Sequence, residues 1–161
     1  MRNLIRSVAS GLIGGLGATG AMSLAMLGAK QIGLLGEPPP RKLVRHFLGR
    51  MRKAPVRGRK RDALAVAAHF AFGGVGGAIF GAVEPRIPPR VPRPLAGMLF
   101  GTAVWALSYA GWIPRLGVMA APHKDRPGRP LVMIASHWIY GAVLGGTTNV
   151  LRRTLHLAAP R

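Results

Sequence analysis

The sequence has no cysteine and only four acidic residues among its 161 positions, and each shortage removes a class of function. Without cysteine there are no disulfides, no thiolate metal sites and no cysteine nucleophile, while the redox compartment stays undetermined. The four acids, Glu37, Asp62, Glu84 and Asp125, all lie in predicted loops or at the ends of apolar stretches. We therefore expect no buried carboxylate, no acid–base pair, no metal site and no enzymatic activity.

Charge is also missing from four long stretches, although the chain carries 23 Lys and Arg and a formal net charge of +19. These stretches place spans at about residues 7–29, 63–83, 94–113 and 131–151. A helix of about 21 residues is roughly 31 Å long, close to the hydrocarbon thickness of a bilayer. The sequence therefore predicts an all-α, polytopic membrane protein whose four transmembrane helices form a single domain, residues 1–161.

The first stretch follows a positively charged start, which is also typical of a signal peptide. Its length favours a membrane span, because it is long enough to cross a bilayer and no convincing cleavage site follows it. The high positive charge would suggest nucleic acid in a soluble chain. Four spans leave no soluble core to carry a basic face, so we do not expect nucleic acid as a partner.

Basic residues gather in the first predicted loop, residues 30–62, which holds eleven of the 23. Within it, residues 43–51 place Leu43, Val44, Phe47, Leu48 and Met51 on one apolar stripe at helical spacing. This pattern predicts a basic amphipathic helix on the membrane surface, with a solvated charged loop as the alternative. The residues expected to contact anionic headgroups are Arg41, Lys42, Arg45, Arg50, Arg52, Lys53, Arg57, Arg59, Lys60 and Arg61.

The distribution of basic residues also predicts an orientation. Loop one (residues 30–62) and loop three (residues 114–130) carry 11 and 4 of them, whereas the amino terminus, loop two (residues 84–93) and the carboxyl tail carry 2, 3 and 3. Short cytoplasmic loops are enriched in Lys and Arg. We therefore expect loops one and three in the cytoplasm and both termini outside.

One short motif occurs twice. Residues 69–77 read His, aromatic, any residue, aromatic, Gly, then Gly again four positions later, and residues 137–145 repeat this order. The repetition predicts two similar two-helix units, related as parallel repeats are by an axis along the membrane normal.

Glycines spaced four apart occur on every predicted span. In lipid, helices associate through close backbone packing, which small residues permit. We therefore expect the spans to pack with one another, and with a second copy or a partner, through glycine strips. The strips contain Gly73, Gly77, Gly81, Gly97, Gly101, Gly141 and Gly145, with Gly11 and Gly15 on the first span.

Two histidines, His69 and His137, lie six residues inside spans two and four and so at similar predicted depth. Three interpretations stay open. The first is a neutral histidine bonded to another helix, through a hydroxyl such as Tyr109, Thr102, Ser108 or Thr148. The second is a proton-sensitive pair, and the third is bis-histidine haem ligation between facing helices. No other signal for a cofactor is present, so none is expected.

The two motif copies, together with the Trp112-Ile113-Pro114 turn and the proline-rich loop before span four, resemble the YagU-like bacterial inner-membrane proteins of unknown function. The resemblance covers most of the chain and is strongest from residue 63 to 151. It implies a multi-pass bacterial inner-membrane protein without assigned catalysis, and a link to acid tolerance has been suggested for members. Loop one is more basic here than the family would lead one to expect.

Together these patterns favour a non-enzymatic integral membrane protein that packs through glycine strips and contacts anionic lipid through a basic loop. A small transporter or channel lined by His69 and His137 is the alternative. A haem-binding electron carrier is the third possibility.

Overall fold

The computed structural model describes residues 2–35, 37, 39–50 and 58–157, and every regular element among them is helical. The elements are α1 (Arg2–Gln31), α2 (Pro39–Arg50), α3 (Arg59–Val83), η1 (Glu84–Arg86), α4 (Arg93–Leu107), η2 (Ser108–Trp112), α5 (Ile113–Arg115), η3 (Pro122–Lys124) and α6 (Arg129–Leu157). The predicted all-α class is confirmed.

Four helical segments are long and apolar enough to cross a membrane, which confirms the four predicted spans. They run over Asn3–Gln31, Arg59–Arg86, Arg93–Arg115 and Arg129–Thr154. Each extends beyond the uncharged stretch that predicted it. Basic residues therefore lie on the end turns of the helices, where long side chains can reach the headgroups while their stems stay apolar.

The third span is not a regular α-helix throughout. Its residues Ser108–Trp112 form a π-helical turn, in which the N–H of Ile113 bonds to the carbonyl of Ser108, five residues earlier. The Ser108 hydroxyl donates to the Val104 carbonyl at 2.6 Å and occupies an acceptor of the preceding turn. Such turns are rare and change the direction in which the following side chains point.

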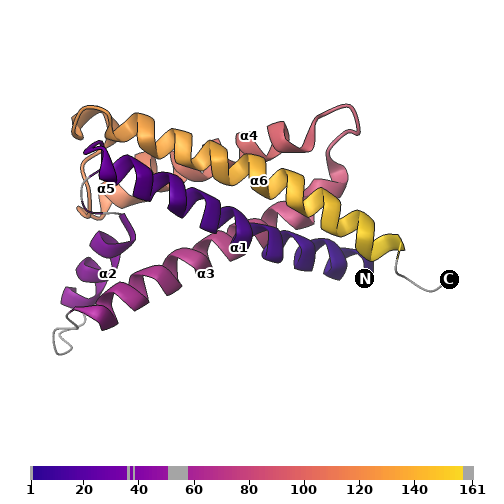
Figure 1. Cartoon of the computed structure of the whole chain (residues 1–161), viewed down its shortest axis with the longest axis horizontal. Helices are drawn as coiled ribbons and strands as arrows, with labels where there is room; N and C mark the ends of the chain where they lie inside the picture. Colours follow the sequence, from indigo (N-terminus) through magenta and orange to yellow (C-terminus); the bar gives the residue numbers. More distant parts are fainter. Residues whose placement is uncertain (1, 36, 38, 51–57, 158–161) are drawn as a thin grey trace.

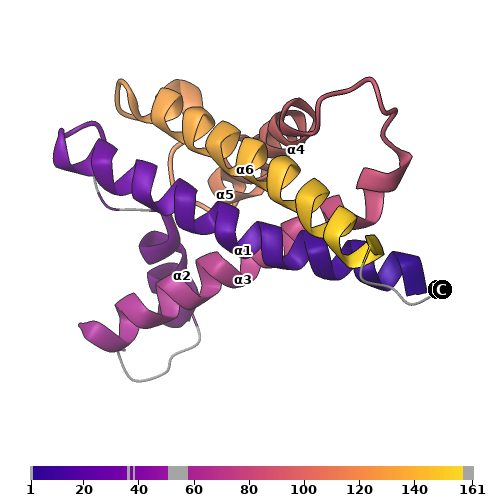
Figure 2. The same cartoon turned by 45° about the vertical axis from the view of Figure 1, so that its right-hand side comes forward.

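The spans pack as two helix pairs, each made of neighbours along the chain (Figure 1). We call α1 with α3 the first pair and α4 with α6 the second pair. The pairs meet mainly where α1 lies along α6, while α3 and α4 barely touch (Figure 2). Two ends result. The α2 end contains α2, the start of α3 and the connection between α5 and α6, and the loop-two end contains η1, the start of α1 and the end of α6 (Figure 1).

The surface of the spans is apolar and the interior holds small and polar residues. Leu24, Leu99, Leu107 and Leu131 are 63–73% exposed. In water such a surface would promote association, whereas in a bilayer it contacts acyl chains. Several buried hydroxyls bond within their own helix, as when Thr19 donates to the Gly15 carbonyl at 2.7 Å. This distribution is what hydrocarbon surroundings require.

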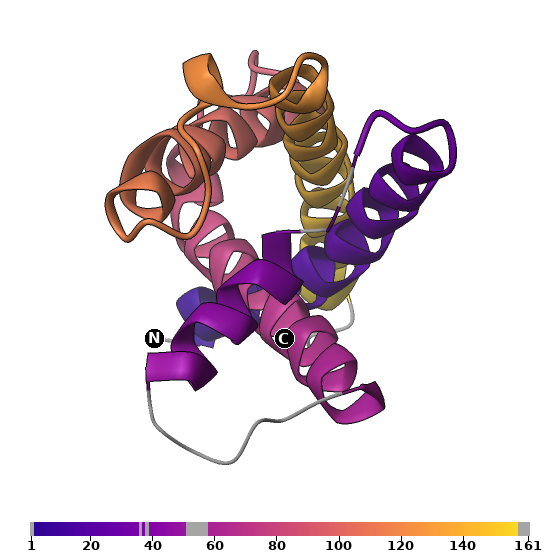
Figure 3. The same ribbon diagram turned by 90° about the vertical axis from the view of Figure 1, so that its left-hand side faces the viewer.

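The predicted amphipathic helix is present as α2, and it packs across the start of α3 (Figure 3). Its apolar stripe divides in two: Leu43 packs against the core, whereas Phe47 is 45% exposed. Arg41 on α2 lies 3.0 Å from Asp62 on α3. Contacts with the rest of the protein therefore hold one side of α2, whereas the side that carries Phe47 is exposed.

Candidate functional site

In the first helix pair, backbone lies directly against backbone. A Cβ added at Gly77 would lie 2.6 Å from the Cα of Gly15, and one at Gly11 would lie 2.8 Å from the Cα of Gly81. Real Cβ atoms do not approach other atoms this closely. Only glycine therefore fits at these positions, and the close approach of the two helices depends on it.

The second pair has an equivalent interface. A Cβ at Gly141 would lie 2.7 Å from the Cα of Met98 and would meet the Gly97 carbonyl. Gly145 faces the backbone of Arg93 in the same way. Gly101 lies against the carbonyl of His137. The glycines named from the sequence on α4 and α6 thus all lie where the two helices touch.

The two pairs are joined by a different contact. Gly14 on α1 faces α6, where a Cβ would lie 2.8 Å from the Thr148 hydroxyl and 2.9 Å from that of Thr147. A hydroxyl also enters the interface within the first pair, where Gly73 on α3 meets the hydroxyl of Thr19 on α1. At these places side chains, and not only backbone, fill the space between helices.

A hydrogen bond across the bundle fixes the relative depth of α3 and α6. The Tyr140 hydroxyl donates to the Gly73 carbonyl at 2.7 Å. His137 lies three residues before Tyr140, and His69 lies four before Gly73. Both histidines therefore lie on the α2 side of this bond, within about one helical turn of it along their helices.

The histidines do not use the interhelical partners proposed for them. His137 is 7% exposed, and its Nδ1 lies 2.7 Å from the Met133 carbonyl of its own helix. The Nε2 of His69 is buried without a hydrogen-bond partner among the residues that the structure describes. The prediction of a histidine bonded to a hydroxyl of a neighbouring helix is therefore wrong.

Those hydroxyls have other roles. Tyr109 donates to Asp125, and Ser108 donates to a backbone carbonyl of its own helix. Thr102 donates to the Met98 carbonyl and accepts the indole N–H of Trp138, which joins α4 to α6. Thr148 is fully buried, with no hydrogen-bond partner in the described part of the chain. The local backbone competes effectively for Ser and Thr hydroxyls in membrane helices.

The expectation that no carboxylate is buried is also wrong, because Glu84 is 0% exposed. Its Oε1 lies 3.0 Å from Arg93 Nε and accepts a hydrogen bond from Arg152 Nη2 at 3.5 Å, and its Oε2 lies 2.8 Å from Arg152 Nε. Glu84 begins η1 directly after α3, Arg93 begins α4, and Arg152 lies near the end of α6. A buried charge needs such partners, and here they tie both helix pairs together at the loop-two end.

A second buried carboxylate lies at the α2 end. The side chain of Asp125 is 5% exposed and accepts the Tyr109 hydroxyl at 2.7 Å, while Arg129 lies 3.4 Å away. Burial alone would raise the pKa of Asp125, but the hydrogen bonds from Tyr109 and the Arg126 N–H, with the charge of Arg129, hold it below its usual value. Loop three is thereby fastened over the end of span three.

Lys42 of α2 lies close to this cluster. Burial lowers the pKa of its ammonium, and the positive charge of Arg129 lowers it further, against smaller opposing effects of Asp125 and Glu37. Among the described residues, no three His, Cys, Asp or Glu side chains gather in a way that could hold a metal ion.

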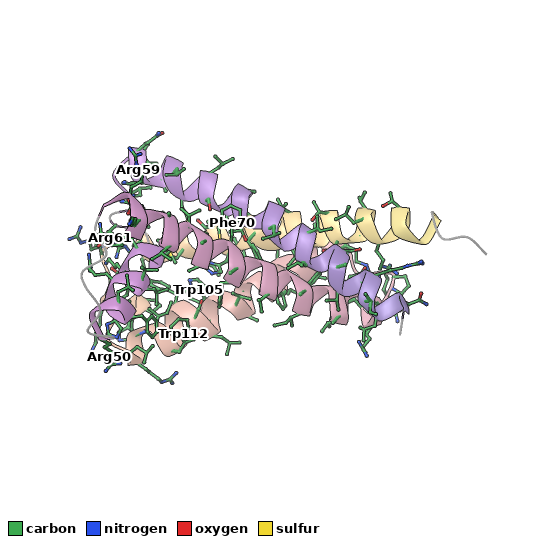
Figure 4. All side chains as sticks on the ribbon, turned by 90° about the horizontal axis from the view of Figure 1, so that it is seen from below. Arg50, Arg59, Arg61, Phe70, Trp105 and Trp112 are labelled. Carbon is green, nitrogen blue, oxygen red and sulfur yellow. The ribbon has the colours of Figure 1, made fainter. Side chains whose placement is uncertain are left out.

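Of the ten residues expected to bind lipid, Lys42 lies beside the Asp125 cluster, and the other nine divide into three groups. Arg41 and Arg45 lie 3.0 and 2.8 Å from Asp62 and Glu37, and Arg61 lies 3.9 Å from Asp62. Within the described residues, Arg50, Arg59 and Lys60 lie within ion-pair distance of no carboxylate. Figure 4 shows Arg50, Arg59 and Arg61 at one end of the molecule. Arg52, Lys53 and Arg57 lie outside the described residues.

Aromatic rings lie inward of these cations along the bundle. Figure 4 places Trp112, Trp105 and then Phe70 at increasing distance from the basic end. Trp112 is 37% exposed at the end of the third span. Indole rings at that level are typical of a membrane–water interface.

These features define a helical membrane-type bundle with four candidate spans, close glycine contacts within each helix pair and a strongly basic end. Residues 5–158 match the family of unknown function DUF6789, and the chain belongs to that family. No curated protein and no solved structure matches the chain. The family match covers all four spans, and the function of the family is unknown. The match does not confirm the finer YagU-like resemblance.

Proposed function

We propose that this protein is a non-enzymatic, multi-pass membrane protein of the YagU-like type, in the bacterial inner membrane. Its glycine strips hold the spans together, and its α2 end binds anionic lipid headgroups. The observation that carries the proposal is the group of exposed cations without carboxylate partners in the described chain, Arg50, Arg59 and Lys60, beside an apolar helix face.

The charge at the α2 end supports this assignment quantitatively. A basic residue near an anionic membrane surface contributes about 1 kcal/mol, so two of them contribute about 2 kcal/mol, or roughly a thirtyfold change in affinity. Exposed Phe47 adds an apolar anchor on the same helix. Asp62 and Glu37 offset the charge of Arg41 and Arg45. The cations at the start of α3, Arg59 and Lys60, therefore form the principal lipid-binding surface.

Association with a second copy is part of the same proposal. Gly17, Gly20 and Gly28 on α1 and Gly146 on α6 have no atom within 4 Å of an added Cβ. They lie on the helices that form the centre of the bundle. A second copy or a membrane partner can approach these helices closely.

Loss of lipid selectivity tests the proposal. The double variant Arg59→Gln with Lys60→Gln removes two exposed charges, and the matched control Arg86→Gln with Arg90→Gln removes two at the opposite end. After extraction from mixed membranes in mild detergent, the wild type and the control should retain mostly anionic phospholipid. The Arg59/Lys60 variant should retain less anionic phospholipid than the control, and equal retention by both variants would refute the proposal.

The absence of cysteine makes the orientation directly measurable. Single cysteines at Gly49 and Arg90 should be labelled from opposite sides by a reagent that does not cross membranes. We propose that Gly49→Cys is reached only after the cytoplasmic side is opened, and Arg90→Cys from outside in intact cells. The reverse labelling pattern would overturn the orientation.

A further inference from the structure

A cavity of about 400 Å³ at the loop-two end is not used by the proposed function. Its walls include prolines of loop two and four polar residues, Arg93, Asn149, Arg152 and Arg153. Two of the four come from neighbouring positions at the end of α6, and Arg93 begins α4. The cavity therefore lies between the two helices of the second pair and the loop that leads into them.

The cavity has an excess of positive charge. Three guanidinium groups line it, and within the described chain the carboxylate that contacts two of them, Glu84, is fully buried. Three positive charges and one negative charge leave a local excess of two. Arg153 is exposed, and within the described residues it has no carboxylate within ion-pair distance. The surplus charge favours an anionic ligand.

The arginines are also held in place before any ligand arrives. Glu84 contacts both Arg93 and Arg152, and Arg93 Nη1 donates to the Ile87 carbonyl at 3.0 Å. Each guanidinium has five N–H donors, so these contacts leave several of them unused. A planar, prepositioned guanidinium suits a phosphate group, because parallel N–H groups can bond to two of its oxygens.

The position of the cavity indicates where the phosphate comes from. Arg93 and Arg152 border the uncharged stretches 94–114 and 130–151, so they lie at the edge of the hydrocarbon layer. We propose that this cavity binds a phosphate group, supplied by an anionic phospholipid of the leaflet at the loop-two end. A soluble phosphate ester offers the same chemistry and is separated from the lipid by the experiment below.

The test uses the full chain in neutral detergent, with bound molecules counted by native mass spectrometry. The probes are phosphatidylglycerol, phosphatidylcholine and soluble glycerol phosphate. Arg153→Gln is the test variant, because Arg153 takes no part in the Glu84 contacts. Arg90→Gln is the matched control, because Arg90 is an exposed arginine of loop two that does not line the cavity. Both are made in the Arg59→Gln, Lys60→Gln background, which removes binding at the α2 end.

We expect one phosphatidylglycerol to remain bound in that background, and Arg153→Gln to weaken it roughly tenfold, as loss of a charge-assisted hydrogen bond would. Arg90→Gln should change the affinity less than about twofold, because screened surface charges contribute little. Equal affinities in the two variants, or no bound anion in this background, would overturn the assignment. Glycerol phosphate bound as tightly as phosphatidylglycerol, and lost in Arg153→Gln, would overturn the lipid source.

Discussion

The two helix pairs solve the same packing problem with different residues. In the first pair Gly11, Gly15, Gly77 and Gly81 bring α1 against α3, but at Gly73 the facing residue is Thr19. In the second pair glycines face backbone along the whole contact, and Gly101 lies against the carbonyl of His137. The first pair thus has a side chain where the second has only backbone.

The difference shows what the repeated motif preserves. Gly73 and Gly141 hold the same place in the two motif copies, but their neighbours are a threonine side chain and a helix backbone. The small residue on α3 or α6 is common to both pairs, while the residue facing it is not. The pairs then meet through α1 and α6 and are tied together by Glu84 at the loop-two end.

Removing the Glu84 carboxylate should break the connection between the pairs, with the largest effect. Glu84→Gln leaves two arginines at a buried site without a counter-charge, which typically costs about 3–5 kcal/mol. The expected result is a strongly reduced thermal midpoint of the detergent-solubilised protein, measured by intrinsic tryptophan fluorescence. Arg86→Gln is the control, because Arg86 is an exposed neighbour whose guanidinium donates to the Ala82 carbonyl and contacts no carboxylate in the described part of the chain. Equal midpoints for the two variants would show that the ion cluster does not join the pairs.

A single added methyl group should separate the helices within either pair. Gly77→Ala and Gly141→Ala place a Cβ against backbone that cannot move aside, with an expected cost of about 1–3 kcal/mol. Gly49→Ala on α2 is the control, because a Cβ there meets nothing within 4 Å and Gly49 lies outside the glycine surface proposed for a second copy. Alanine favours helix over glycine by about 1 kcal/mol, so the control should be neutral or stabilising.

The measurement is again the thermal midpoint, compared across the three alanine variants. If Gly77→Ala and Gly141→Ala were as stable as Gly49→Ala, the close backbone contacts would not exist in the folded protein. A loss in only one pair would instead show that the two interfaces are unequal, in spite of their similar geometry.

Much of this architecture can be predicted from the sequence because hydrocarbon penalises charge so strongly. The four spans follow from uncharged stretches, and α2 follows from the spacing of Leu43, Val44 and Phe47. The helices extend beyond the predicted spans, because basic residues such as Arg59 continue the helix into the headgroup region.

The pairing of the charged residues could not be predicted in the same way. Glu84, Arg93 and Arg152 each border an uncharged stretch, which was a visible signal of shared depth at one membrane face. Which boundary charges meet depends on how α3, α4 and α6 cross, and periodicity carries no information on that. The Tyr109–Asp125 contact was missed for a related reason, because loop three folds back over the end of its own span.

The α2 end should respond to acid through Asp125. Because the folded-state pKa of this carboxyl lies below its unfolded value near 4, its stabilisation is present above that value and is lost as pH falls through the folded pKa. The thermal midpoint of the wild type should therefore decrease when the pH is lowered below about 4, and this decrease should be smaller in Asp125→Asn. Identical acid profiles for the two proteins would exclude Asp125 as a source of the loss.

The smallest expected effect concerns the bond that joins the two pairs in mid-membrane. Tyr140→Phe removes the hydroxyl that donates to Gly73, and interhelical hydrogen bonds in membranes contribute only about 0.6 kcal/mol on average. The thermal midpoint should fall slightly. Because a Cβ at Gly76 would lie 3.1 Å from the Tyr140 hydroxyl, Gly76→Ala should cost more in the wild type than in Tyr140→Phe. A double-mutant cycle measures this coupling directly, and strictly additive midpoint changes would place Tyr140 away from Gly76 and α3.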